Sequence, residues 1–230
     1  MDYGTNLKFF DLNHRKKVKL LKVIGIPLML VGAVLLIVTS FGGYGMWYLS
    51  TPAWGMLVIG GPLWAVSLSM KVKESDMMNL VEDAKRDFKD YAEDKLNYPS
   101  DLHQNSLILV GSCQDPDGRE SERQPRTLKS GGLLYPIVTY AYLYIRRDRV
   151  TVLTRRLSLC EEWSEDKAAD YDFADFDGAG VQPVANDLGK AYAFCLKQGD
   201  EVIFSTPVFI DDYTKEAFAA DILHAKERRR

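Results

Sequence analysis

A long block without any ionisable residue constrains the fold of this chain more than any other feature. Residues 23–70 contain no Asp, Glu, Lys, Arg or His, although 27% of the whole chain is charged. Forty-eight such residues in a row are too many for one buried helix of a small soluble domain. The block therefore predicts segments that cross a lipid bilayer.

The block divides into two spans joined by a glycine-rich segment. Residues 23–41 would form a helix of roughly 28 Å, which matches the thickness of a hydrocarbon core. Residues 54–70 are shorter, and Gly60, Gly61 and Pro62 weaken the middle of that span. We expect residues 42–53 to form a tight turn, so the prediction is a transmembrane helical hairpin over residues 23–70.

Basic residues on both sides of this hairpin predict its orientation. Residues 1–73 carry a net charge of +6, and the flanking basic residues are Arg15, Lys16, Lys17, Lys19, Lys22, Lys71 and Lys73. Because positive loops stay in the cytoplasm, we expect a multi-pass protein of the plasma or inner membrane with both termini inside the cell. A secretory signal peptide is the alternative. The apolar region of a signal peptide is usually shorter than residues 23–41, however, and in this chain a second apolar span follows at once.

Small residues on the second span predict close helix packing. Gly61, Ala65 and Ser69 recur every four residues, a spacing that lets another helix approach. The partner would be the first span, through Gly25 or Gly32, or a second copy of the chain in a homo-oligomer. No ionisable residue lies within the hairpin, which favours an anchor over an ion pathway.

The remainder of the chain is acidic and belongs in water. Residues 74–230 carry a net charge of −9, which argues against nucleic acid as a partner because phosphate binding needs clustered Lys and Arg. The three cysteines match no metal-ligand spacing, so we expect no metal and no cofactor. Residues 71–97 show helical periodicity and predict an amphipathic connector helix, packed either on the soluble domain or on a partner helix.

From residue 105 the periodicity changes from helical to alternating, which predicts antiparallel strands. The predicted strands are residues 107–111, 138–145, 150–159, 171–176, 180–184, 191–196 and 201–205. Residues 211–227 predict a final helix with Phe218, Ile222 and Ala225 on one face. The fold class is therefore α+β, with a curled antiparallel barrel over residues 105–230 that one helix caps.

Several of these segments resemble the bacterial pleckstrin-homology-like (bPH) domains that occur attached to transmembrane hairpins. The resemblance lies in the hairpin at residues 142–153, the acidic strand at residues 170–177, the last hairpin through Phe204, and the terminal helix. It implies a PH-like scaffold that binds peptides, proteins or sometimes lipid headgroups, usually without catalysis. The family's basic loops direct attention to Arg146, Arg147, Arg149, Arg155 and Arg156 as headgroup or partner ligands, although acids surround them.

The sequence thus predicts a basic segment (residues 1–22), a membrane hairpin (23–70), a connector helix (71–97) and a soluble PH-like domain (105–230). Our leading hypothesis is a noncatalytic membrane-anchored protein that binds or regulates a protein partner at the cytoplasmic membrane face. One alternative is an enzyme at the bilayer surface that pairs His103 or His224 with a carboxylate. Another is a small oligomeric transport or channel component.

Overall fold

Two compact units make up the chain. The computed structural model describes residues 2–41, 48–96, 106–113, 123–129, 132–184, 191–209 and 214–228. One unit comprises Asp11–Lys73, and the other combines Met1–Phe10 with Glu74–Arg230. The amphipathic connector therefore belongs to the same unit as the strands.

The smaller unit contains two helices, α2 (Leu12–Phe41) and α3 (Ser50–Ser69). Both helical segments are long and apolar enough to cross a membrane by length and composition. Many of their large apolar side chains lie on the surface of the protein, including Leu30, Val34, Ile37, Val58 and Ile59, each more than half exposed. A helix in the core of a soluble protein would bury such side chains, because each one left in water forgoes about 1.5–3 kcal/mol.

Glycines form the contact between α2 and α3, which run antiparallel. Gly25 lies against Gly60 and Leu63, whereas Gly32 lies against Ala53, nearer the N-terminal end of α3. A Cβ added at Gly60 would be 2.7 Å from the backbone nitrogen of Met29. The first span therefore packs on α3 through Gly25 and Gly32, the two glycines that the sequence suggested for this contact.

The stripe of Gly61, Ala65 and Ser69 does not face α2. A Cβ added at Gly61 would meet no atom within 4 Å, and Ala65 and Ser69 are exposed. The neighbouring residues Gly60 and Ser67 are the buried ones on α3. The role of the Gly61 stripe in helix packing stays a prediction.

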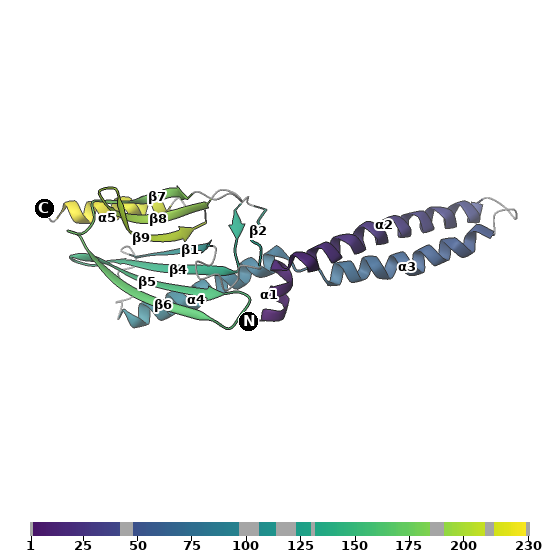
Figure 1. Ribbon diagram of the computed structural model, residues 1–230, viewed down its shortest axis with the longest axis horizontal. Helices are drawn as coiled ribbons and strands as arrows, with labels where there is room; N and C mark the ends of the chain where they lie inside the picture. The colour runs from purple at the N-terminus through teal and green to yellow at the C-terminus, as the bar shows by residue number, and fades with distance from the viewer. Residues whose placement is uncertain are drawn as a thin grey trace. The chain divides into compact units, whose positions relative to one another are not determined.

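The larger unit has two antiparallel sheets as its centre (Figure 1). The first sheet has the order β1–β4–β5–β6, and the second has the order β7–β8–β9. Their bounds are Ser106–Cys113 (β1), Ile137–Ile145 (β4), Arg149–Ser158 (β5), Ser164–Asp172 (β6), Gly178–Val184 (β7), Ala191–Gln198 (β8) and Glu201–Val208 (β9). A short pair, β2 (Arg126–Thr127) and β3 (Leu133–Leu134), lies outside these two sheets.

Helix α4 (Glu74–Lys95) covers the outer face of the first sheet. Its Phe88 ring centroid lies 6.0 Å from that of Tyr140 on β4, and the Tyr140 hydroxyl donates a hydrogen bond of 3.0 Å to the Val81 carbonyl. Burial raises the pKa of Tyr140, with Glu82 adding to the shift. Of the two packing modes that the sequence left open for this helix, the structure has the intramolecular one.

The N-terminal residues also belong to this unit. Helix α1 (Tyr3–Phe10) buries Phe9 and Phe10, and the Asn6 amide donates a 2.7 Å hydrogen bond to the Leu159 carbonyl. This helix is not predicted from the sequence, because its few apolar residues show no extended periodicity and a run of basic residues follows.

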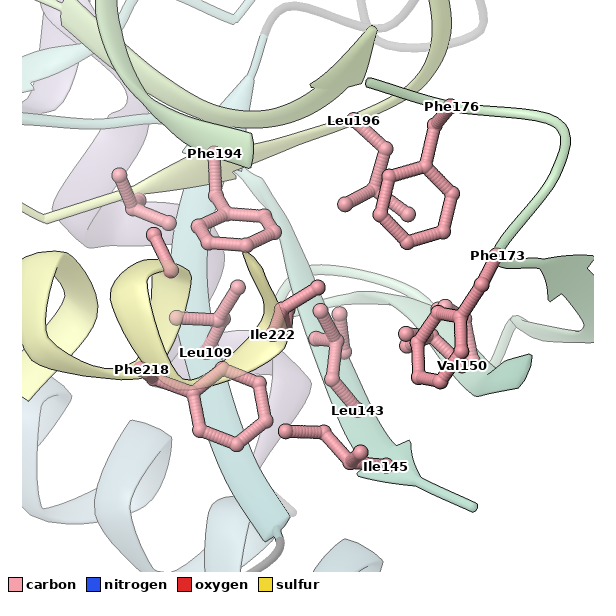
Figure 2. Packing of buried hydrophobic residues seen from close by; sticks show 14 residues of the cluster. Leu109, Leu143, Ile145, Val150, Phe173, Phe176, Phe194, Leu196, Phe218 and Ile222 are labelled. Carbon is pink, nitrogen blue, oxygen red and sulfur yellow. The ribbon is translucent and has the colours of Figure 1, made fainter. Parts of the chain in front are cut away.

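The hydrophobic core lies between the two sheets, at the end where helix α5 (Thr214–Glu227) packs. Phe218 and Ile222 of α5 point toward Leu109, Leu143 and Ile145 (Figure 2). These α5 residues are two of the three predicted to share a face, and Ala225 packs against the same cluster. Figure 1 shows α5 beside β7.

The described strands do not close into the single barrel that we predicted. β1 and β9 approach each other, and the Phe209 amide donates a 2.9 Å hydrogen bond to the Val110 carbonyl, but no strand ladder joins the two sheets. Pro207 on β9 has no N–H to donate at this crossing. At the same place, a Cβ on Gly111 would overlap the backbone of Pro207.

The acidic strand also lies earlier than predicted. β6 begins at Ser164 and ends at Asp172, whereas residues 173–175 form a turn. Its charged residues lack the alternation that marks a strand. Pairing with β5 across ion pairs holds it in the sheet.

Substitution of Gly111 tests the crossing of β1 and β9. We expect Gly111→Ala to lower the free energy of unfolding by about 1–3 kcal/mol or more, because the new methyl group meets rigid backbone. Gly180→Ala is the control, since an added Cβ there meets nothing within 4 Å. Chemical denaturation of both variants in detergent measures the difference, and equal midpoints would contradict the close approach.

Adjacent glycines of α3 test the helix contact in the smaller unit. We expect Gly60→Val to destabilise the α2–α3 pair by about 1–3 kcal/mol, whereas Gly61→Val leaves it unchanged. The reason is that only the first position has backbone of α2 within 3 Å of the added carbon. Thermal unfolding in detergent provides the measurement, and a larger loss from Gly61→Val would show that its stripe makes the important contact.

Candidate functional site

The five arginines proposed from the sequence do not converge on one site. Arg146, Arg147 and Arg149 lie at the turn between β4 and β5. Arg155 and Arg156 are successive residues of β5, so their side chains point to opposite faces of the sheet. Each group therefore has to be considered separately.

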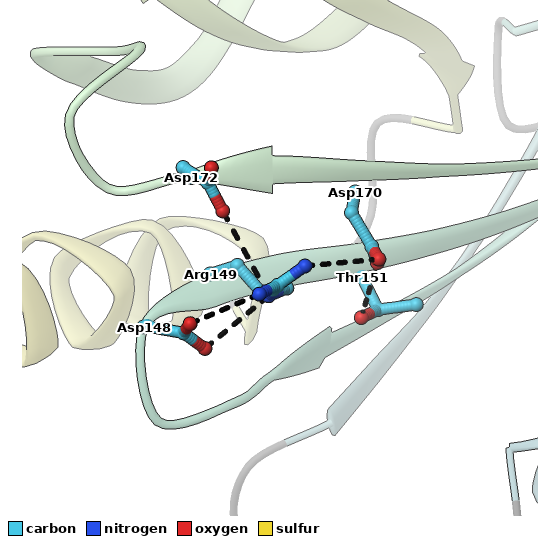
Figure 3. A network of polar contacts seen from close by, with 5 residues as sticks. All are labelled: Asp148, Arg149, Thr151, Asp170 and Asp172. Carbon is cyan, nitrogen blue, oxygen red and sulfur yellow. Dashed lines mark hydrogen bonds and ion pairs between the residues drawn. The ribbon is translucent and has the colours of Figure 1, made fainter.

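Aspartates neutralise the charge at the β4–β5 turn. The Arg149 guanidinium lies 3.0 Å from the Asp148 carboxylate, 3.5 Å from that of Asp170 and 3.7 Å from that of Asp172 (Figure 3). The Thr151 hydroxyl donates a further 2.7 Å hydrogen bond to Asp170. Hydrogen bonding to Asp148 raises the pKa of Arg149 most, and the charges of all three aspartates add to the shift. Three arginines and three aspartates thus balance here, which weakens any attraction for an anionic headgroup.

Arg155 is part of the packing between β5, β6 and α4. Its guanidinium makes two 2.7 Å hydrogen bonds to the Asp166 carboxylate and lies 4.4 Å from the ring centroid of Tyr91. The hydrogen bond from Arg155 lowers the pKa of Asp166. This arginine fixes the outer face of the sheet and is poorly placed to bind a ligand.

Arg156 faces the space between the two sheets. Its guanidinium lies 3.6 Å from the Glu165 carboxylate and 5.7 Å from the ring centroid of Trp163. The same carboxylate lies 3.0 Å from the Lys167 ammonium group. Both cations thus contact the same carboxylate.

Arg156 and Lys167 line a cleft of about 600 Å³ between the two sheets, at the end opposite the α5 contact. That volume lies in the range of ordinary ligand sites. Residues of β5 and β6 form one wall, and residues 204–207 of β9 form the other. The polar lining includes Thr139, Thr154, Arg156, Lys167 and Thr206.

An aromatic pair and a buried hydroxyl mark the cleft. The rings of Tyr171 and Phe204 lie 5.6 Å apart, and burial raises the pKa of Tyr171. Thr206 is 1% exposed, and its hydroxyl has no hydrogen-bond partner in the part of the chain that the structure describes. A buried polar group without a partner costs about 1–3 kcal/mol, so such a group deserves a functional explanation.

The cleft lies beside the outer strand of the first sheet. β6 pairs with β5 on one side, and no other described strand pairs with it. Its side chains are largely exposed, including Ala168 and Ala169 in the cleft wall. A free strand edge offers unpaired backbone N–H and C=O groups to an added strand.

Of the cleft residues, only Arg156 is predicted from the sequence to bind a ligand. The sequence of β5 does contain a pattern that indicates the cleft, because Val150 and Val152 share a face with Thr154 and Arg156. A change from apolar to polar along one face marks the end of the core. The opposing wall on β9 could not be found in this way, because no sequence pattern shows which strands face each other.

The histidines do not form a catalytic pair in the described residues. His224 lies 3.4 Å from Glu227 on the surface of α5, with both side chains more than two-thirds exposed. His103 lies outside the described residues, together with the rest of residues 97–105, between α4 and β1. Within the described residues, no group of three or more His, Cys, Asp and Glu side chains could hold a metal ion.

Comparisons with known proteins give no relative: no protein family, curated protein or solved structure matches this chain. The site therefore has to be interpreted from its own geometry.

The Arg155–Asp166 pair predicts a pH-dependent contribution to stability. Because the folded-state pKa of Asp166 is lowered, the pair stabilises the protein above about pH 4, and the effect is lost as the pH falls through the folded-state pKa. We expect Asp166→Asn to cost about 1 kcal/mol at pH 7 and progressively less below pH 4.

Denaturant unfolding in detergent at a series of pH values measures this cost. Asp87→Asn, at an exposed position of α4, is the matched control and should show no such dependence. A loss for Asp166→Asn that stays constant down to pH 2 would contradict the ionic origin of the effect.

Proposed function

We propose that this protein is a membrane-anchored, noncatalytic PH-like binding module that recruits or regulates a protein partner at the cytoplasmic membrane face. The observation that carries the proposal is the open cleft beside the unpaired edge of β6. A rigid sheet with a free edge and an adjacent cleft suits recognition of an extended chain.

The smaller unit supports the membrane part of the proposal. Exposed apolar side chains along α2 and α3 are compatible with a lipid environment. The sequence also has no ionisable residue from position 23 to 70. Basic residues precede α2 from position 15 to 22 and follow α3 at Lys71 and Lys73, which supports cytoplasmic termini. The hairpin then acts as an anchor.

The strand order supports the PH-like part. The seven strands of the two main sheets are followed by a final helix, which is the order of elements on which the bPH resemblance rests. The neutralised turn around Arg149 favours a protein partner over an anionic headgroup. The enzyme alternative gains no support from His224, which lies on an exposed helix beside Glu227.

Photo-crosslinking in cells tests the proposal. With benzoylphenylalanine in place of Ala169, whose side chain faces the cleft, we expect a discrete adduct with one other protein, and we expect it to stay in the membrane fraction after an alkaline wash. The same amino acid in place of Asp221, on the exposed surface of α5, is the matched control and should give no such adduct. An absence of protein adducts, or recovery of the full chain in the soluble fraction, would overturn the proposal.

A further inference from the structure

Resting on the proposed function, we propose that the cleft binds an extended segment of a partner protein, which adds to the edge of β6 as an antiparallel strand and inserts the carboxylate of one acidic residue between the sheets. Three observations carry it: the free edge of β6, the charge of the cleft and the buried Thr206 hydroxyl.

The register of β6 determines which side chains an added strand would meet. Lys167, Ala169 and Tyr171 face Thr154, Val152 and Val150 of β5, and so lie on the inner, cleft side of the sheet. Asp166, Ala168 and Asp170 lie on the outer side, where Arg155 and Thr151 bind the two aspartates. An added strand therefore meets a basic and apolar inner row and an acidic outer row.

Charge complementarity selects an acidic residue for the inner row. Arg156 and Lys167 are the charged residues among the described residues that line the cleft, so a carboxylate entering it would lie beside two cations. The small Ala169 side chain of β6 leaves room for an apolar side chain of the incoming strand, beside the Tyr171–Phe204 pair. On the outer side, Asp170 favours a basic residue and repels an acidic one.

Thr206 provides the hydrogen bond that fixes the carboxylate. Its hydroxyl is buried, lines the cleft, and has no hydrogen-bond partner among the described residues. A hydroxyl in that state can donate to an inserted carboxylate oxygen without first breaking another bond. Among the described residues, the same hydroxyl makes no hydrogen bond that would stabilise the fold.

The inference specifies a test peptide. In an antiparallel strand, residues opposite Tyr171, Ala169 and Lys167 come in that order along the peptide, so they are chosen as Val, Leu and Glu, with Lys opposite Asp170. The probe is acetyl-Thr-Val-Lys-Leu-Thr-Glu-Thr-amide with a fluorescent label. We expect saturable binding to the full chain in detergent, with a dissociation constant below about 1 mM by fluorescence anisotropy.

Two variants separate binding from folding. We expect Thr206→Val to weaken binding about tenfold while leaving the thermal unfolding temperature unchanged or higher, because it removes a buried hydroxyl that lacks a partner. We expect Lys167→Glu to weaken binding by about tenfold, and a peptide with Lys in place of Glu to restore it. Lys89→Glu on α4 makes the same charge change away from the cleft and should bind as the parent does.

Peptide methylation tests the strand pairing itself. Successive amides of a strand point in opposite directions, so N-methylation of one alternate set should abolish binding and methylation of the other set should not. Equal binding of both methylated peptides, or unchanged binding to Thr206→Val and Lys167→Glu, would overturn the inference. If the peptide does not bind at all while the adduct at position 169 still forms, this inference fails and the proposed function stands; loss of both removes both.

Discussion

The close approach of β1 and β9 is the constraint on which the larger unit depends. Gly111 lies so near the backbone of Pro207 that no side chain fits between the strands. The single hydrogen bond from Phe209 to Val110 joins the sheets just beyond this point. Because Pro207 has no N–H, the approach cannot extend into a ladder. The two sheets are therefore brought together at one position while each keeps its own hydrogen bonding.

The interior between the sheets is divided as a result. At one end, α5 inserts Phe218 and Ile222, and the space fills with apolar side chains (Figure 2). At the other end, threonines and two cations face the same space, and a cleft remains. On the outer face, α4 buries Tyr140 against Phe88, so the first sheet has support on its far side too. A sheet held in this way can present an edge without depending on a ligand for its shape.

The sequence predicted the elements with strong periodicity and missed those held by contacts between distant residues. The hairpin of β4 and β5, the hairpin of β8 and β9 and the apolar face of α5 follow from alternating or helical patterns and were found. Helix α1 was missed because its burial depends on Arg126 and Leu159, far along the chain. β6 was misplaced because its charged residues show no alternation. Its place in the sheet depends on cross-strand partners, of which Arg155 for Asp166 is the clearest.

The candidate site was only partly within reach of the sequence for a related reason. The arginines of the β4–β5 hairpin were predicted to bind a ligand as one group. Because side chains alternate along β5, however, Arg155 lies on the outer face of the sheet and Arg156 lies in the cleft. Thr206 and Phe204 become part of the site only because β9 crosses the first sheet at Gly111. No local pattern encodes that crossing, because the two residues that permit it, Gly111 and Pro207, lie nearly a hundred positions apart.

The two faces of β6 explain how a free edge can be specific. Acids on its outer row, two of them bound by Arg155 and Thr151, would face the same acids in a second copy of the chain, and this repulsion opposes edge-to-edge self-association. The inner row carries Lys167 and the small Ala169, which would instead favour a strand that has an acidic and an apolar side chain on that face. Self-pairing and the proposed strand addition thus make opposite demands on charge at one strand. That opposition allows the edge of β6 to stay open without promoting association of the protein with itself.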